Sequence, residues 1–145
     1  MKIEVALMHR GCVPIPAVSA VIVKNGRILL VKRGREPNKG LWSLPGGSIE
    51  LGETVREALA REVLEETSLV VEVGDVASVH HVISRDGDRI AFHYVIVSFF
   101  ARAVGGTLKP SSDAAEARWV PLGEINDLPT TAGLVERLRS IGLPA

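Results

Sequence analysis

The sequence predicts an α+β fold in which helices flank a mixed, largely antiparallel sheet. Two observations predict it. The periodic segments follow the order strands, helix, strands, helix. In addition, two tight-turn signals, Asn25-Gly26 and Asp86-Gly87-Asp88, join neighbouring strand-like runs as antiparallel hairpins. A chain of 145 residues is long enough to bury one core, so we expect a single domain over residues 1–145.

The first expected element is a β-hairpin. Residues 17–23 are mostly apolar, and residues 28–31 resume the apolar run after Asn25-Gly26. The next segment, residues 33–40, contains charges, a proline and two glycines, which together predict an exposed loop.

A short strand and a helix are expected next. Residues 41–44 read as a strand that is stopped by Pro45-Gly46-Gly47. Thr54, with Glu57 three residues later, is a capping-box signature, so a helix should begin at about Thr54. Its expected buried stripe consists of Val55, Ala58, Leu59 and Val63.

The second half of the chain repeats the order of strands and then a helix. Residues 70–83 and 89–103 are two long strand-like runs joined by the second hairpin signal. Residues 117–120 are a last short strand, and apolar residues at helical spacing predict a C-terminal helix over residues 131–141.

Composition and charge narrow the classes of function. The 17 basic and 17 acidic residues cancel, so no global field would hold the chain on nucleic acid or on an anionic membrane. A small diffusible substrate fits better. Cys12 is the only cysteine, which suits a reducing cytoplasm. Residues 1–10 lack a continuous apolar segment and no long uncharged apolar run follows, so neither a secretory signal nor a membrane span is expected.

The predicted helix carries a dense group of carboxylates. At about 100° per residue, Glu62, Glu65 and Glu66 project from one helix face, where their mutual repulsion is destabilising. Arg61 can pair with Glu65 one turn on, but one cation does not balance three anions. A hard divalent cation such as Mg²⁺, which takes oxygen ligands, is the natural counter-charge.

The residues around these carboxylates form a pattern. Gly47 is followed after five residues by Glu53 and after seven more by Arg61-Glu62-Val63-Leu64-Glu65-Glu66-Thr67-Ser68-Leu69. This resembles the Nudix box, G-x5-E-x7-R-E-U-x-E-E-x-G-U with U apolar. Ser68 departs from it, because glycine is expected there and best suits a left-handed helix end. The alternative, a solvated salt-bridged helix face, requires a chance match of roughly one in 10⁷.

The resemblance implies an α/β/α sandwich and a hydrolase that uses Mg²⁺ or Mn²⁺ to split a diphosphate joining a nucleoside to another group. On that resemblance Glu65 and Glu66 are the principal metal ligands. Glu62 is a ligand or the group that takes the proton of water, and no single base is assigned. The carbonyl oxygen of Gly46 completes the metal shell.

Other residues take supporting roles on the same resemblance. Arg61 would orient the glutamates, and Glu53 would hold Arg61 or act beside it. Glu116 matches the place where some relatives have an additional carboxylate, although an ordinary loop acid is equally expected. Arg33 and Arg35 are candidates to meet substrate phosphate, against the default of a solvated basic loop.

The substrate is less constrained than the reaction. The positions that separate some Nudix subfamilies hold Ser84, Arg85 and Asp86, which match neither the proline nor the tyrosine signature. The downstream segment resembles small prokaryotic Nudix proteins grouped with ADP-ribose pyrophosphatases, so ADP-ribose is favoured. The alternatives are an oxidised nucleoside triphosphate and a non-catalytic nucleotide-sensing domain. RNA-cap removal fits poorly with the neutral charge. A homodimer is a possible form.

Overall fold

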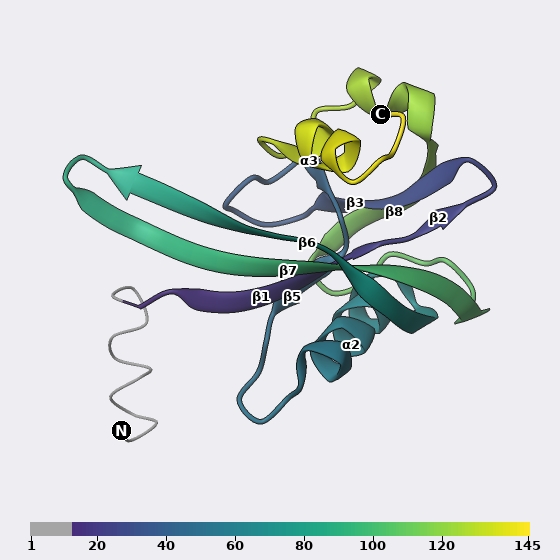
Figure 1. The fold of residues 1–145 in the computed structure, drawn as a ribbon, viewed down its shortest axis with the longest axis horizontal. Coiled ribbons are helices and arrows are strands. Elements are labelled where there is room, and N and C mark those ends of the chain that lie inside the picture. The colour runs from purple at the N-terminus through teal and green to yellow at the C-terminus, as the bar shows by residue number, and fades with distance from the viewer. Residues whose placement is uncertain (1–12) are drawn as a thin grey trace.

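The computed structural model describes residues 13–145, so the expectations for residues 1–10 and for Cys12 lie outside the described residues. Two sheets form the centre of the structure, with helix α2 (Val55–Thr67) on one side and helix α3 (Leu134–Ser140) on the other (Figure 1). The predicted α+β class, with a mixed sheet and flanking helices, is confirmed.

The first sheet has the strand order β5-β1-β7-β6. Its strands are β5 (Gly46–Ser48), β1 (Ile15–Val21), β7 (Arg89–Gly106) and β6 (Leu69–Asp86). Strands β1 and β7 run parallel, and the other two pairings are antiparallel. The short strand β5 and the long strand β6 therefore lie at opposite edges.

The second sheet is built on β3. Its strands are β2 (Val23–Lys24), β3 (Arg27–Arg33), β4 (Trp42–Ser43) and β8 (Ala114–Pro121). All three pairings with β3 are antiparallel. The 3₁₀ helix η2 (Leu122–Asp127) then leads toward α3.

The expected first hairpin is correct only near its turn. Val23 pairs with Ile28 and Lys24 with Arg27, but β1 leaves for the other sheet and pairs with β5 and β7. The reason is burial on both faces. Val18 and Val21 are both less than 3% exposed, which suits a central strand better than one arm of a surface hairpin.

The expectation that Pro45-Gly46-Gly47 only stops a strand is wrong. Strand β4 ends at Ser43, and Gly46–Ser48 is itself strand β5, paired with β1. A Cβ atom on Gly46 would collide with the carbonyl oxygen of Val18. Glycine therefore lets this segment approach β1 closely enough to pair.

The later elements match their predictions with shifted ends. The second hairpin is confirmed, with Asp86 opposite Arg89, and β6, β7 and β8 are longer than expected. Helix α3 is shorter, because Gly133 before it has a left-handed φ of 81°. Val55 is 37% exposed and does not belong to the buried stripe, since it lies in the first turn of α2.

Helix α2 has the predicted start and an unpredicted end. Thr54 accepts a hydrogen bond from the Glu57 amide, and the Glu57 side chain accepts one from the Thr54 amide, so the capping box is present. At the other end Ser68 itself adopts the left-handed conformation, with φ of 66°. Its hydroxyl donates to the carbonyl of Lys109 at 3.0 Å, a contact that a glycine lacks.

Two apolar clusters fill the two sides of the structure. One packs α2 against the first sheet and contains Val18, Ala20, Ile22, Leu29, Ala58, Leu59, Val63, Leu69 and Phe99. The other packs η2 and α3 against the second sheet and contains Val21, Ile28, Leu30, Trp42, Val120, Ile125, Leu134 and Leu138. Within residues 13–145, the helices lack the length and apolar character needed to cross a bilayer.

Candidate active site

Arg61 is the centre of the carboxylate cluster on α2. Its Nε and Nη2 atoms donate to the two oxygens of Glu53 at 2.6 and 2.9 Å, which is a bidentate pair. Nη2 also donates to the carbonyl oxygen of Ser48 at 3.1 Å. The guanidinium is therefore fixed between the helix, the loop before it and the end of β5, and its planar shape makes this possible.

The remaining nitrogen of Arg61 faces the other carboxylates. Nη1 donates to Glu62 Oε1 at 3.0 Å and to Glu65 Oε2 at 3.3 Å, and it lies 3.6 Å from Glu50 Oε1. The contact with Glu50 was not anticipated from the sequence. Hydrogen bonds with Glu53 and Glu62 raise the pKa of Arg61, and the bond from Arg61 lowers the pKa of Glu53.

Glu66 lies apart from this network. Its Oε2 accepts a hydrogen bond from the backbone amide of Gly46 at 3.1 Å, which joins α2 to β5. Burial raises the pKa of Glu66 to about 8, with repulsion from Glu62 acting in the same direction and the Gly46 amide opposing both. A carboxylate held this way needs a nearby cation to stay ionised at neutral pH.

Gly47 lets Glu62 lie against the backbone of β5. A Cβ atom at Gly47 would sit 2.6 Å from each carboxylate oxygen of Glu62. Burial raises the pKa of Glu62, while the bond from Arg61 opposes that rise. The Glu65 side chain is 46% exposed, compared with 15% for Glu62, so it lies toward the open side of the cluster.

The segment after β7 closes the C-terminal end of α2. The amide of Lys109 donates to the Thr67 carbonyl at 2.9 Å, and that of Ser111 donates to the Glu66 carbonyl at 3.1 Å. The negative charge of Asp113 raises the pKa of both Glu62 and Glu66. The sequence alone does not indicate this position of Asp113, because nothing in its spacing shows that the loop returns to α2.

The three residues predicted to bind substrate each make other polar contacts. The charge of Arg33 lowers the pKa of Glu66, although Arg33 Nε donates to the carbonyl of Pro37 at 2.8 Å. Arg35 pairs with Asp113 at 3.1 Å. Glu116 pairs with Lys32, at 3.5 Å, and more weakly with Arg118. Their roles stay predictions.

The donors suit a hard divalent cation, although they do not converge on one point. Within residues 13–145, no three His, Cys, Asp or Glu side chains stand close enough together to hold a metal ion. Glu62 and Glu65 turn toward Arg61, and Glu66 turns toward Gly46. Carboxylate oxygens are nevertheless the preferred ligands of Mg²⁺, and the half-buried Glu66 carboxyl has no hydrogen bond from Arg61 among the described contacts. The chemistry of these donors therefore fits such an ion, and their side chains would turn toward it on binding.

Comparison with known proteins identifies close relatives. Residues 13–139 match the family model described as the NUDIX domain. An ADP-ribose pyrophosphatase of Methanocaldococcus jannaschii is 40% identical over 119 residues, which are 82% of this chain and 67% of that protein. A putative 8-oxo-dGTP diphosphatase 2 of Mycobacterium tuberculosis is 37% identical, over 77% of this chain and 76% of that protein. The crystal structure of a MutT NUDIX hydrolase from Burkholderia pseudomallei superposes with a TM-score of 0.73 at 31% identity, covering 88% of this chain and 97% of that one.

The raised pKa of Glu66 predicts how stability depends on pH in the metal-free protein. An unfolded chain ionises this carboxyl near pH 4.5, whereas the folded protein holds the proton until about pH 8. The free energy of unfolding should therefore fall as the pH rises from about 4.5 to about 8, by a few kcal/mol, since one pKa unit is about 1.4 kcal/mol. Urea unfolding in EDTA at pH 5 and pH 8 measures this.

The substitution Glu66→Gln isolates the effect. It should remove most of the difference between pH 5 and pH 8, while Glu124→Gln, an exposed carboxyl on η2, should leave it unchanged. If the free energy of unfolding falls between pH 5 and pH 8 by the same amount in Glu66→Gln as in the unmodified protein, Glu66 is not the group responsible.

Proposed function

Because this chain belongs to the Nudix family and is a hydrolase of phosphoric anhydride bonds, we propose that it cleaves a nucleoside diphosphate linked to another moiety, with ADP-ribose favoured. The relative with 40% identity is named an ADP-ribose pyrophosphatase. The observation that carries the proposal is the Arg61 network, which gathers Glu53, Glu62 and Glu65 at the helix that also carries the half-buried Glu66.

A divalent cation, Mg²⁺ or Mn²⁺, completes this proposal. When bound, it neutralises charge on the diphosphate and lowers the pKa of water. The residues that would hold it are Glu62, Glu65, Glu66 and the carbonyl oxygen of Gly46. Glu66 and Glu62 are the most deeply placed of these carboxylates, so they would gain most from a cation that offsets their repulsion.

The chain's own residues then have distinct tasks in the hydrolysis. The oxygen of water bonds to one phosphorus, the bond from that phosphorus to the bridging oxygen breaks, and a nucleoside monophosphate and a second phosphate ester leave. The proton of water passes to a carboxylate. Glu62 and Glu66 are both candidates once a bound cation keeps Glu66 ionised, because burial raises the pKa of each above its ordinary value and so favours uptake of a proton.

Positioning falls to Arg61 and Glu53. Because the bidentate pair with Glu53 fixes the guanidinium, Arg61 holds Glu62 and Glu65 in one orientation without entering the reaction. Arg33 and Arg35 are proposed to meet substrate phosphate at the margin of the site. Glu116 is proposed as a further acidic group there.

The second candidate substrate is an oxidised nucleoside triphosphate, hydrolysed to a monophosphate and pyrophosphate. The relative from Mycobacterium tuberculosis favours it, since its name is that of an 8-oxo-dGTP diphosphatase at 37% identity. Both reactions use the same carboxylates. We place the protein in the cytoplasm, with a small nucleotide as its partner and without nucleic acid or membrane, and cell fractionation tests that location.

A substrate panel with matched variants tests the proposal. ADP-ribose, sugar nucleotides, dinucleotides, 8-oxo-dGTP and the ordinary triphosphates are compared at one concentration with Mg²⁺, and released phosphate products are measured. We expect ADP-ribose to give the highest kcat/KM. Glu66→Gln should lower it by about 10²-fold or more, whereas Glu72→Gln, an exposed carboxyl on β6, should leave it unchanged.

Two outcomes would contradict this account. Preference for 8-oxo-dGTP would replace the first substrate with the second. Full turnover of Glu66→Gln in EDTA would refute the metal-dependent reaction as a whole.

We also propose that two copies associate through β6. This strand is 18 residues long, lies at the edge of the first sheet and exposes Val76 and Val79, by 52% and 63%. An edge strand of this length offers unpaired backbone groups to a second strand, and two copies of β6 related by a two-fold axis pair antiparallel.

Sedimentation equilibrium tests the association. We expect a dimer at micromolar concentration. Val79→Lys should shift the mass toward that of a monomer, because lysine opposes pairing at an edge, while Val104→Lys on β7 should not. A monomeric unmodified protein at 100 μM, on the order of the highest concentration normally used, would overturn the proposal.

A further inference from the structure

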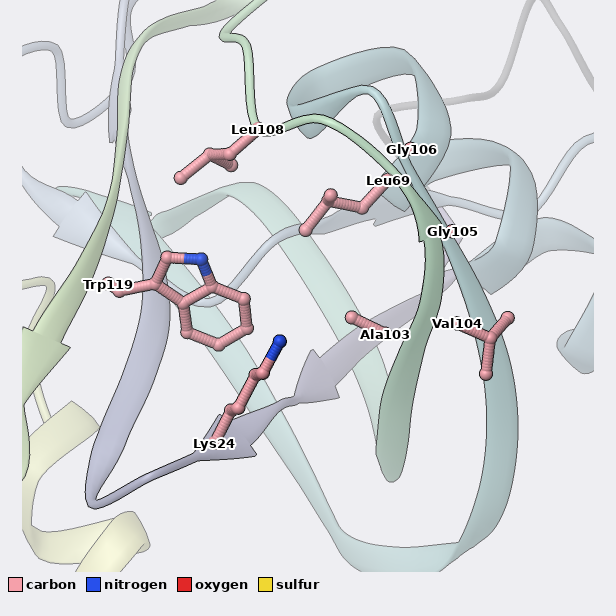
Figure 2. A pocket seen from close by; sticks show the side chains of 8 residues that line it. All are labelled: Lys24, Leu69, Ala103, Val104, Gly105, Gly106, Leu108 and Trp119. Atoms are coloured by element: carbon pink, nitrogen blue, oxygen red, sulfur yellow. The ribbon is translucent and has the colours of Figure 1, made fainter.

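A cavity of about 380 Å³ lies away from the carboxylate cluster (Figure 2). Its volume is within the range of small-molecule pockets. It is lined from β2, β8, the start of β6, the end of β7 and the loop after β7 by Lys24, Leu69, Ala103, Val104, Gly105, Gly106, Leu108 and Trp119. None of the residues assigned to the hydrolysis lines it.

The cavity combines an aromatic ring with a cation. Figure 2 shows the indole of Trp119 along one side, the Lys24 ammonium pointing into the space beside it, and Leu69 and Leu108 at the far end. Among residues 13–145, no carboxylate comes within ion-pair distance of Lys24. The positive charge is therefore left for solvent or for a ligand.

The wall opposite Trp119 includes bare backbone. Gly106 has a φ of 84°, and a Cβ atom there would collide with the carbonyl oxygen of Ser68. Glycine is thus required where β7 ends against the start of β6. Gly105 and Gly106 therefore line the cavity with backbone atoms alone.

The cavity is separate from the catalytic carboxylates but shares a segment with them. Glu62 and Glu66 contact β5, at the edge of the first sheet opposite β6. Leu108, which lines the cavity, belongs to the segment whose Ser111 amide donates to the Glu66 carbonyl. A molecule in the cavity would therefore sit beside the end of the catalytic helix without touching the carboxylates.

We propose that this cavity is an accessory binding site for a planar aromatic molecule that carries an anionic group. The ring would lie against the indole of Trp119, which favours stacking of flat π systems. The anion would pair with the ammonium of Lys24. Leu69 and Leu108 would cover the apolar edge of the ring. The assignment does not depend on which substrate the hydrolase cleaves.

The two tryptophans of the chain give a direct test. In ¹⁵N-labelled protein with EDTA, the indole N–H signals of Trp42 and Trp119 are assigned by loss of one signal in Trp119→Phe. Naphthalene-1-sulfonate and AMP are then titrated separately. We expect at least one of them to shift the Trp119 indole and the Gly105 and Gly106 amides saturably, while the buried Trp42 indole stays in place.

Matched variants separate the cavity from general charge and from the catalytic site. Lys24→Gln should weaken binding about 10-fold, as expected for loss of a charged hydrogen bond. Lys109→Gln removes a nearby exposed cation and should not weaken it, and Glu66→Gln should also bind normally. Binding of both probes would show that an aromatic ring with any anionic group is sufficient. Binding of AMP alone would show that ribose and phosphate contribute.

The proposal would be overturned by three results. The first is no saturable shift of the Trp119 indole with either probe. The second is an affinity that Lys24→Gln leaves unchanged. The third is a loss of the shift in Glu66→Gln, which would assign the effect to the catalytic site.

Discussion

The bidentate pair between Arg61 and Glu53 is the interaction on which the rest of the site depends. Six glutamates occur between residues 50 and 66, on α2 or just before it, and one guanidinium contacts four of them. Because Glu53 and the Ser48 carbonyl hold two of its nitrogens, the third can face Glu62 and Glu65 only from one direction. Glu53, Glu62 and Glu65 are thereby held in one arrangement around Arg61, from which Glu62 and Glu65 would turn to reach a cation.

The strand β5 is the second constraint, and two glycines make it possible. Gly46 permits pairing with β1 and donates its amide to Glu66, while Gly47 leaves space for the carboxyl of Glu62. A side chain at Gly46 would separate β5 from β1, and one at Gly47 would push Glu62 of the helix away from β5. The close contact between the backbone of β5 and the carboxylates of α2 therefore depends on the two glycines as well as on the hydrogen bond to Glu66.

The sequence predicted helix α2 far better than its surroundings. The start at Thr54 and the shared face of Glu62, Glu65 and Glu66 follow from local rules of capping and periodicity. The path of β1 was not predictable from the Asn25-Gly26 turn, because its partners β5 and β7 are distant in sequence and only burial on both faces selects them. The approach of Asp113 to Glu66 was missed for the same reason. At Ser68 the sequence lacks the glycine that best suits a left-handed helix end. Ser68 adopts that conformation nevertheless, and its hydroxyl donates a hydrogen bond to the Lys109 carbonyl.

The account's central claim is that Arg61, held by Glu53, arranges the carboxylates for a divalent cation. Titration of Mn²⁺, followed by the relaxation of water protons, tests it in Glu53→Gln against the unmodified protein, with folding checked by thermal unfolding. The account predicts a loss of Mn²⁺ affinity of about 10-fold or more in a variant that still folds, as is typical when a residue that orients ligands is removed. Unchanged affinity in folded Glu53→Gln would contradict it.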